Sequence, residues 1–135
     1  MKDMKHIFSL VLAATLLLAA APAWAQNPQE PDIDELINTQ LENLTRSFKL
    51  DEVQVFFVDS VLQHNLPAMT EEFARTQKTG ASNQETYQII SDKWMAATDE
   101  AFERIFRPDQ WAKYMKSTYG KEKKRRDKRI QERGL

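Results

Sequence analysis

After Pro31, apolar residues recur every three or four positions along the chain, a spacing that is typical of amphipathic helices. The first such stripe predicts a helix over residues 32–48. It consists of Ile33, Ile37, Leu41, Leu44 and Phe48. No segment shows the alternation of apolar and polar residues that indicates a strand, and glycine is scarce. The pattern therefore predicts an all-α fold.

A second helix is predicted to begin after Asp51, where the chain carries a helix-start signal. Asp51 with Gln54 three residues later is a capping-box pattern, and Leu50 is placed to act as a hydrophobic staple. The apolar stripe that follows keeps one phase: Val55, Val58, Leu62, Leu66, Met69 and Phe73. Because this phase continues past Pro67, we expect a kink in one helix there.

The third predicted helix has a wide apolar arc. Ser82 and Glu85 form another capping-box pattern after Gly80 and mark its start. Its apolar residues form two neighbouring stripes, Tyr87, Ile90, Trp94, Ala97, Ala101 and Ile105 in the first, and Met95, Phe102 and Phe106 in the second. Together they cover about half of the helix, which is wider than one packed face needs.

Three apolar residues at the start of the second helix also lie outside its stripe. Val53, Phe56 and Phe57 point to its far side and must be covered by another helix, a second subunit or a client protein. With the second stripe of the third helix, they predict an exposed apolar groove or a dimer interface. The predicted surface consists of Val53, Phe56, Phe57, Met95, Phe102 and Phe106.

The end of the chain predicts one more helix and a basic tail. Pro108 suits the first turn of a fourth helix, with Trp111, Tyr114 and Met115 on its apolar side and Gly120 as its stop. We expect residues 121–135 to be frayed helix or disordered, because so charged a segment has little to bury. The predicted domain, residues 32–120, is a small antiparallel bundle or hairpin of about four helices with a kinked second helix.

The first 25 residues have the pattern of a secretory signal peptide. A positively charged start precedes an apolar run from Ile7 to Ala21, and Ala23-Trp24-Ala25 is a small-x-small site that signal peptidase accepts. The run is shorter than the about 20 apolar residues that cross a bilayer. We therefore expect cleavage after Ala25, a flexible leader over residues 26–31, and a periplasmic or secreted protein without a membrane span.

Composition removes several kinds of chemistry. The chain has no cysteine, so disulfides and thiolate sites are excluded. Beyond the predicted signal peptide the chain has one histidine, His64, and no second histidine stands at a metal-binding spacing from it. No serine–histidine arrangement and no glycine-rich phosphate loop occurs. We therefore expect no catalytic residues, no metal ligands and no cofactor.

Charge is unevenly placed along the predicted mature chain. Residues 26–120 carry nine basic and sixteen acidic residues, whereas residues 121–135 carry eight basic and three acidic ones. An acidic body argues against a nucleic-acid-binding fold, which carries positive charge on its folded surface. The basic tail could bind anionic lipid headgroups or an acidic partner. A solvated, disordered end is the commoner use of such a charge run.

Two short segments resemble the Leu-Thr-x-x-Gln motifs of the Spy/CpxP family of periplasmic helical proteins. Leu50-Asp51-Glu52-Val53-Gln54 stands where the first motif would, with Asp51 as the cap in place of threonine. Phe106-Arg107-Pro108-Asp109-Gln110 is similar to the second motif, which often reads Leu-Thr-Pro-Glu-Gln. The resemblance covers residues 50–115. It implies an antiparallel, dimeric, cradle-shaped protein that holds unfolded clients or takes part in envelope-stress sensing.

The sequence therefore favours a non-enzymatic exported binding protein, a periplasmic chaperone or envelope-stress protein that holds clients on its apolar helical surface. The alternative is a homodimeric envelope scaffold, in which the same residues bury the dimer interface and the basic tail docks an envelope protein. A metal-responsive sensor is a third and weaker hypothesis. The expected partners are unfolded proteins, an envelope protein and a second copy of the chain, and no nucleic acid.

Overall fold

The computed structural model describes residues 32–80 and 83–134. The expected signal peptide, residues 1–25, and the expected leader, residues 26–31, lie outside the described residues. All the helices described below belong to one compact unit that begins at Ile33.

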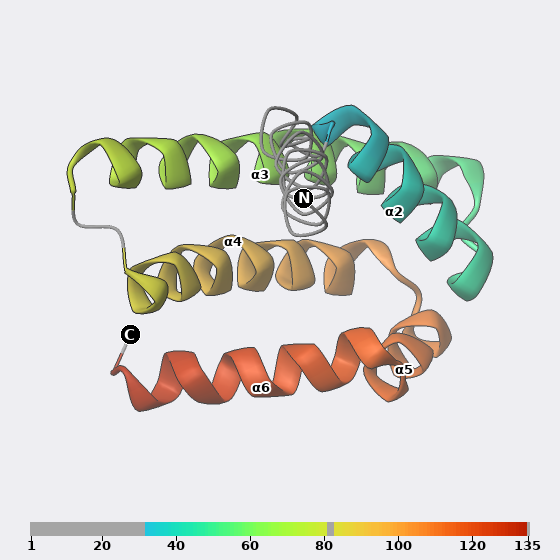
Figure 1. Ribbon diagram of the computed structural model, residues 1–135. Coiled ribbons are helices and arrows are strands. Elements are labelled where there is room, and N and C mark those ends of the chain that lie inside the picture. Colours follow the sequence, from blue (N-terminus) through green and yellow to red (C-terminus); the bar gives the residue numbers. More distant parts are fainter. Residues whose placement is uncertain (1–31, 81–82, 135) are drawn as a thin grey trace, which may run out of the picture. The chain divides into compact units, whose positions relative to one another are not determined.

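The described part contains five helices and no strand, so the all-α prediction is confirmed with one helix more than expected. They are α2 (Ile33–Phe48), α3 (Glu52–Lys78), α4 (Gln84–Ile105), α5 (Pro108–Lys116) and α6 (Thr118–Glu132). Helices α3, α4 and α6 lie side by side with α4 in the middle, and each runs opposite to its neighbour (Figure 1). Helix α2 packs on α3, and α5 contacts both α2 and α6.

Helix α3 begins as the sequence predicts. Asp51 is its N-cap, and the Asp51 Oδ1 atom accepts a hydrogen bond from the Gln54 backbone N–H at 2.8 Å. The Gln54 Oε1 atom accepts one from the Asp51 N–H at 3.0 Å, which completes the capping box. Pro67 lies inside α3, which continues through it as one helix. The kink expected at Pro67 stays a prediction.

Helix α4 begins one residue later than the sequence pattern suggests. Its N-cap is Asn83, whose Oδ1 atom accepts hydrogen bonds from the Thr86 backbone N–H at 2.8 Å and from the Thr86 hydroxyl at 2.9 Å. Asparagine is at least as good an N-cap as serine, and the threonine hydroxyl adds a second donor. The capping box expected from Ser82 and Glu85 is therefore wrong by one position.

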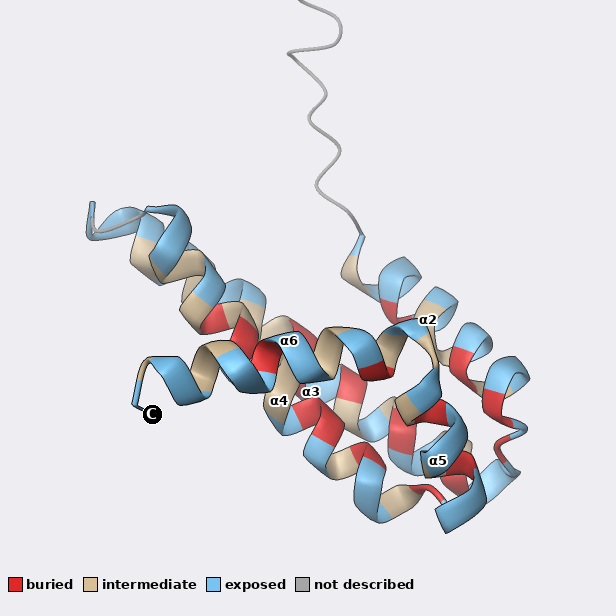
Figure 2. Ribbon diagram, turned by 90° about the horizontal axis from the view of Figure 1, so that it is seen from below, coloured by how far each residue is buried: buried red, intermediate tan, exposed pale blue. Residues whose placement is uncertain are grey.

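The hydrophobic core lies where α2 and the first half of α3 meet the end of α4 and α5. In Figure 2 the buried residues, in red, gather on the facing sides of these helices. Burying each such side chain stabilises the fold by about 1.5–3 kcal/mol. The buried members are Ile37, Leu44, Phe48, Leu50, Val58, Leu62, Leu66, Phe102, Phe106 and Tyr114. The centres of the two stripes predicted for α2 and α3 are thus confirmed.

The connection between α5 and α6 differs from the prediction that Gly120 ends the fourth helix. Gly120 lies inside α6 and is buried, and α5 already ends at Lys116. A Cβ atom at Gly120 would collide with the Met115 backbone carbonyl. Glycine is therefore needed at this position for the close approach of two helices, and not for a helix stop.

Candidate functional site

The aromatic patch, defined as Val53, Phe56 and Phe57, is the most exposed apolar feature of the described residues. The three side chains are 65%, 67% and 50% exposed, respectively. The two phenylalanine rings meet edge to face with centroids 5.6 Å apart. The patch lies on the first two turns of α3, on the side away from the residues that pack into the core.

The other three residues predicted for this surface do not join the patch. Phe102 and Phe106 are 3% and 5% exposed, and their rings stack at 5.6 Å inside the core. Met95 is half-buried on α4. The single six-residue surface expected from the sequence is therefore wrong. Phe106 is not available at the surface because α5 folds back and its Tyr114 and Trp111 rings cover it.

The wide apolar arc of α4 reflects its central position. Helix α4 packs against α3 on one side and α6 on another, and Phe102 and Phe106 at its end meet Tyr114 of α5. A helix with several neighbours needs a broad buried face, so the width of the arc does not indicate an empty binding surface.

Gln54 fixes the helix turn that carries the aromatic patch. It lies between Val53 and Val55 in the chain but points inward and is buried. Its Nε2 atom donates to Gln110 Oε1 at 2.6 Å and to the Ile105 carbonyl at 3.1 Å. Gln110 Nε2 returns a hydrogen bond to Gln54 Oε1 at 3.2 Å. The start of α3 is thus joined to the start of α5 by a buried pair of amides.

Gln110 completes this amide network on its own side. Its Oε1 atom accepts from the Arg107 backbone N–H at 2.9 Å, which caps α5. Its Nε2 atom also donates to the carbonyls of Phe48 at 3.1 Å and Lys49 at 3.2 Å, at the end of α2. Because buried polar groups are costly when unpaired, this filled network holds α2, α3 and α5 in one arrangement.

The two motif-like segments therefore meet in space. Leu50 is a buried core residue, and Asp51 and the two glutamines take part in the caps just described. Pro108 and Asp109 are exposed on the first turn of α5. The role of these segments in the structure is to set the angle between helix starts, which leaves the aromatic patch outside.

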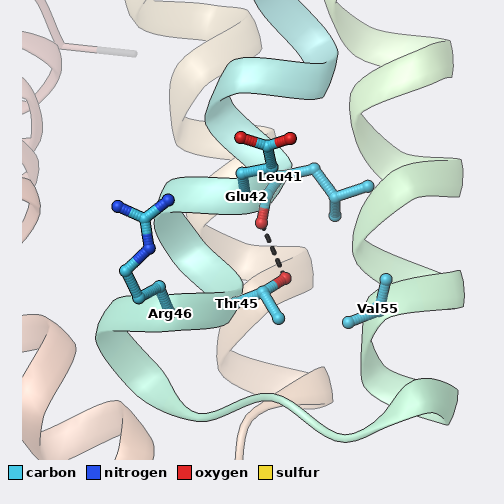
Figure 3. Close-up of a pocket in the computed structure, with 5 residues that line it drawn as sticks. All are labelled: Leu41, Glu42, Thr45, Arg46 and Val55. Atoms are coloured by element: carbon cyan, nitrogen blue, oxygen red, sulfur yellow. Dashed lines mark hydrogen bonds between the residues drawn. The ribbon is translucent and has the colours of Figure 1, made fainter.

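An open groove lies between α2 and α3. Its volume is about 400 Å³, and Leu41, Glu42, Thr45, Arg46 and Val55 line it. In Figure 3 the side chains of Leu41 and Val55 face the gap between the two helices, while Arg46 extends away from α3. The Thr45 hydroxyl donates to the Leu41 carbonyl at 2.6 Å, so its methyl group is free to line the groove. Val55 also packs against the hydrophobic core, so the groove lies on the core side of α3 and is separate from the aromatic patch.

The arginine face of α6, defined as Arg126, Arg129 and Arg133, binds two buried carboxylates of α4. Arg126 Nη2 donates to Asp99 Oδ2 at 2.7 Å, and the Tyr114 hydroxyl donates to Asp99 Oδ1 at 2.7 Å. Arg129 binds Asp92 through two nitrogens at 2.9 and 3.0 Å, and Arg133 adds a third bond at 2.7 Å. Both aspartates are only 2% exposed.

These contacts shift the pKa values of Asp92, Arg129 and Tyr114. Burial alone would raise the pKa of Asp92, but the hydrogen bonds from Arg129 and Arg133 outweigh it and hold that pKa below the ordinary carboxylate value. The bond to Asp92 likewise raises the pKa of Arg129. Burial, together with the neighbouring Asp99 carboxylate, raises the pKa of Tyr114 well above its usual range. The charged forms of Asp92 and Arg129 and the neutral form of Tyr114 are thus favoured.

The expectation that residues 121–135 form a frayed or disordered tail is wrong for the described residues. Helix α6 covers the segment to Glu132, and it contacts both α4 and α5. The segment has few apolar side chains to bury, but its contact with α4 is made by arginines and aspartates. One signal was present in the sequence: Asp92 and Asp99 are seven residues apart, as are Arg126 and Arg133, so each pair lies on one face of its helix.

The remaining polar groups between α3 and α4 form structural contacts. His64 is exposed, and its Nδ1 atom lies 2.8 Å from Asn65 Oδ1. Asn65 donates to the Thr98 hydroxyl at 2.9 Å. Glu72 accepts from Trp94 Nε1 at 2.6 Å, and this bond, aided by Lys93, holds the pKa of Glu72 below its ordinary value despite partial burial.

Two further findings concern the described part of the chain only. No three His, Asp or Glu side chains there lie close enough together to hold a metal ion. No helix there is both long and apolar enough to cross a membrane.

Comparison with protein-family models, with curated proteins and with solved structures gives no match to this chain. The resemblance of the two motif-like segments to the Spy/CpxP family stays a prediction from the sequence.

Proposed function

We propose that the chain is a non-enzymatic binding protein that holds apolar segments of unfolded client proteins on the aromatic patch. The observation that carries the proposal is the exposure of Phe56 and Phe57 on a helix start that the buried amides of Gln54 and Gln110 hold in place. Two phenylalanine rings left in solvent, outside a core that buries Phe48, Phe102, Phe106 and Tyr114, are a costly feature unless they bind something.

The size of the patch favours a short client segment over a second copy of the chain. An aromatic side chain offers 150–250 Å² of surface, so at these exposures the patch presents on the order of 300 Å². A standard protein–protein interface needs about 800 Å² per partner. Two or three apolar side chains of a client are enough to cover the patch.

The surroundings of the patch suggest which clients bind best. The outward side of α3 from Val53 to Pro67 carries Ser60, Gln63 and His64 but no carboxylate, lysine or arginine. Glu52 and Asp59 flank this uncharged strip along one edge. Apolar client segments that are followed by lysine or arginine fit this arrangement, because the basic residues would meet the acidic edge.

The proposed place of action is the periplasm or the outside of the cell. This part of the proposal is supported by the signal-peptide pattern of residues 1–25, which does not depend on the fold. The alternative, a homodimeric scaffold that docks partners through a free basic tail, has less support. Arg126, Arg129 and Arg133 are already engaged with α4.

The proposal is tested with the exported and processed chain and a chemically denatured model protein that aggregates on dilution. We expect the chain to suppress aggregation at near-stoichiometric amounts. The double variant Phe56→Ser/Phe57→Ser should lose most of this protection with unchanged helicity. Leu36→Ser is the matched control, because Leu36 is an exposed apolar residue on α2, 44% accessible and outside the patch. Equal protection by the double variant and the control would contradict the proposal.

A further inference from the structure

Helix α6 carries a second charged surface that the contact with α4 does not use. Lys121, Lys124 and Lys128, here called the lysine face, are spaced three and four residues apart and are all exposed. At 3.6 residues per turn they fall on the side of α6 opposite Arg126. Because Arg126 reaches into α4, the lysine face points away from the rest of the molecule.

The lysine face is largely unpaired. Within the described residues, Lys121 and Lys124 make no ion pair. Lys128 approaches Glu132 at 3.9 Å, with both side chains more than half exposed. Exposed pairs of this kind contribute little stability. The three charges are therefore available to an external partner.

The two faces of α6 use different cations. The side chains that bind the buried aspartates are arginines, whose planar heads make the multiple hydrogen bonds seen at Asp92. The outward side chains of the lysine face are strongly hydrated point charges on flexible stems. Such groups fit a surface of many mobile anionic groups better than one shaped pocket.

We propose that the lysine face docks the chain on the surface of an anionic lipid bilayer. Three lysines on one side of a straight helix span about 10 Å, enough to meet several headgroups at once. No apolar side chain lies among them, so the contact is electrostatic and peripheral, without insertion. Lipid headgroups can move to match the lysine spacing, whereas stacking of nucleic-acid bases would need aromatic rings that this face lacks.

The charge of the whole chain favours this orientation. Residues 26–120 are net acidic and residues 121–135 net basic, so an anionic surface repels the body and attracts α6. Helices α3 and α6 lie on opposite sides of α4 (Figure 1). A chain bound through α6 therefore presents α3 and the aromatic patch away from the bilayer. The inference goes beyond the proposed function and does not rest on it.

The test is flotation of the exported and processed chain with lipid vesicles. One set contains only phosphatidylcholine, and in the other about one lipid in three is phosphatidylglycerol. The test variant carries Lys121→Gln, Lys124→Gln and Lys128→Gln. The matched control removes the same charge from exposed positions on α3 and α4, with Arg75→Gln, Lys78→Gln and Arg104→Gln. Circular dichroism verifies that both variants keep their helices.

We expect the chain to bind only the anionic vesicles at about 0.1 M salt and to dissociate at about 1 M, where charges are screened beyond about 3 Å. Each lysine near such a surface contributes roughly fivefold, so the triple lysine variant should bind about 100-fold more weakly. The control should bind like the unaltered chain. No binding to anionic vesicles, equal loss in both variants, or equal binding to neutral vesicles would overturn the proposal. Binding to a soluble polyanion such as heparin with none to vesicles would also overturn it, in favour of another class of partner.

Discussion

The start of α3 and the whole of α6 reverse the usual relation between hydropathy and burial. At the start of α3, three apolar side chains lie in solvent, while the polar Gln54 between them is buried. In α6, one of the most highly charged segments of the chain, Arg126 is buried and its partner Asp99 is almost inaccessible. In both places, a polar side chain is buried because it makes hydrogen bonds to a specific partner elsewhere in the chain. The apolar or polar character of a residue alone predicts neither the exposure of the α3 phenylalanines nor the burial of Arg126.

Among these residues, we expect substitution of Asp99 to reduce the stability of the fold most. Substituting Asp99 by alanine leaves the Arg126 guanidinium and the Tyr114 hydroxyl buried without their acceptor. We expect the free energy of unfolding to fall by about 3–5 kcal/mol, as for other buried pairs that lose one partner. Urea unfolding followed by circular dichroism measures this loss.

Glu100→Ala is the control for Asp99→Ala. Glu100 is the next residue in α4 and pairs with Arg104 on the surface, with both side chains about 70% exposed. Its loss should cost less than about 1 kcal/mol. If both variants were equally stable, α6 would not depend on its buried aspartates.

The phenylalanines test the other half of the comparison. Phe102→Ala removes a core ring and should destabilise the fold by about 3–5 kcal/mol. Phe56→Ala removes an exposed ring of the same kind and should change stability by no more than about 0.5 kcal/mol. Thermal unfolding of the two variants side by side is the measurement. A large loss from Phe56→Ala would mean that its ring is packed and cannot receive a client.

Gln54 is a buried polar residue among the exposed apolar residues of α3. We expect its substitution to reduce stability less than the changes at Asp99 and Phe102. Gln54→Ala leaves the amide of Gln110 without one acceptor and one donor in a buried place. The expected cost is about 1–3 kcal/mol. In a double-mutant cycle with Gln110→Ala, the second substitution should cost less in the Gln54→Ala background than alone, with a coupling of about 0.5–3 kcal/mol. Additive effects would show that the two amides act independently.

The sequence predicts well those helix faces that pack against a single core and those caps that are formed by neighbouring residues. The stripes around Ile37 and Val58 each face a single core, and the Asp51 cap is local, so spacing and residue type suffice. The prediction fails where the partner is distant in the chain. Phe102 and Phe106 are covered by α5, and Arg129 meets Asp92 thirty-seven residues away. Neither the position of α5 nor the register of α6 follows from local pattern.

The same limit applies to the binding surface. The sequence separates Val53, Phe56 and Phe57 from the stripe of α3 because the direction of a side chain on one helix follows from its position. It does not separate them from Phe102, since that requires knowing what lies beside α4. The six-residue surface therefore reduces to its α3 half. The lysine face appears only once the register of α6 assigns Arg126 to the inside.

Acid should weaken the contact between α4 and α6 gradually as the pH falls. We expect this loss of stability to be smaller than that caused by the substitutions above. The folded-state pKa of Asp92 is lower than its ordinary value of 3.8, so folding favours the charged form. Its contribution is fully present above about pH 5 and is lost as pH falls through 4 toward the folded-state pKa. The carboxylate faces Arg129 and Arg133, and Lys93 follows it on α4 but pairs with Glu72. Unfolding free energies measured between pH 6 and pH 2 should therefore decline less steeply for Asp92→Asn than for the unaltered chain. Parallel curves would place the acid sensitivity in other carboxylates, and the arginine face would then hold α6 without help from the charge of Asp92.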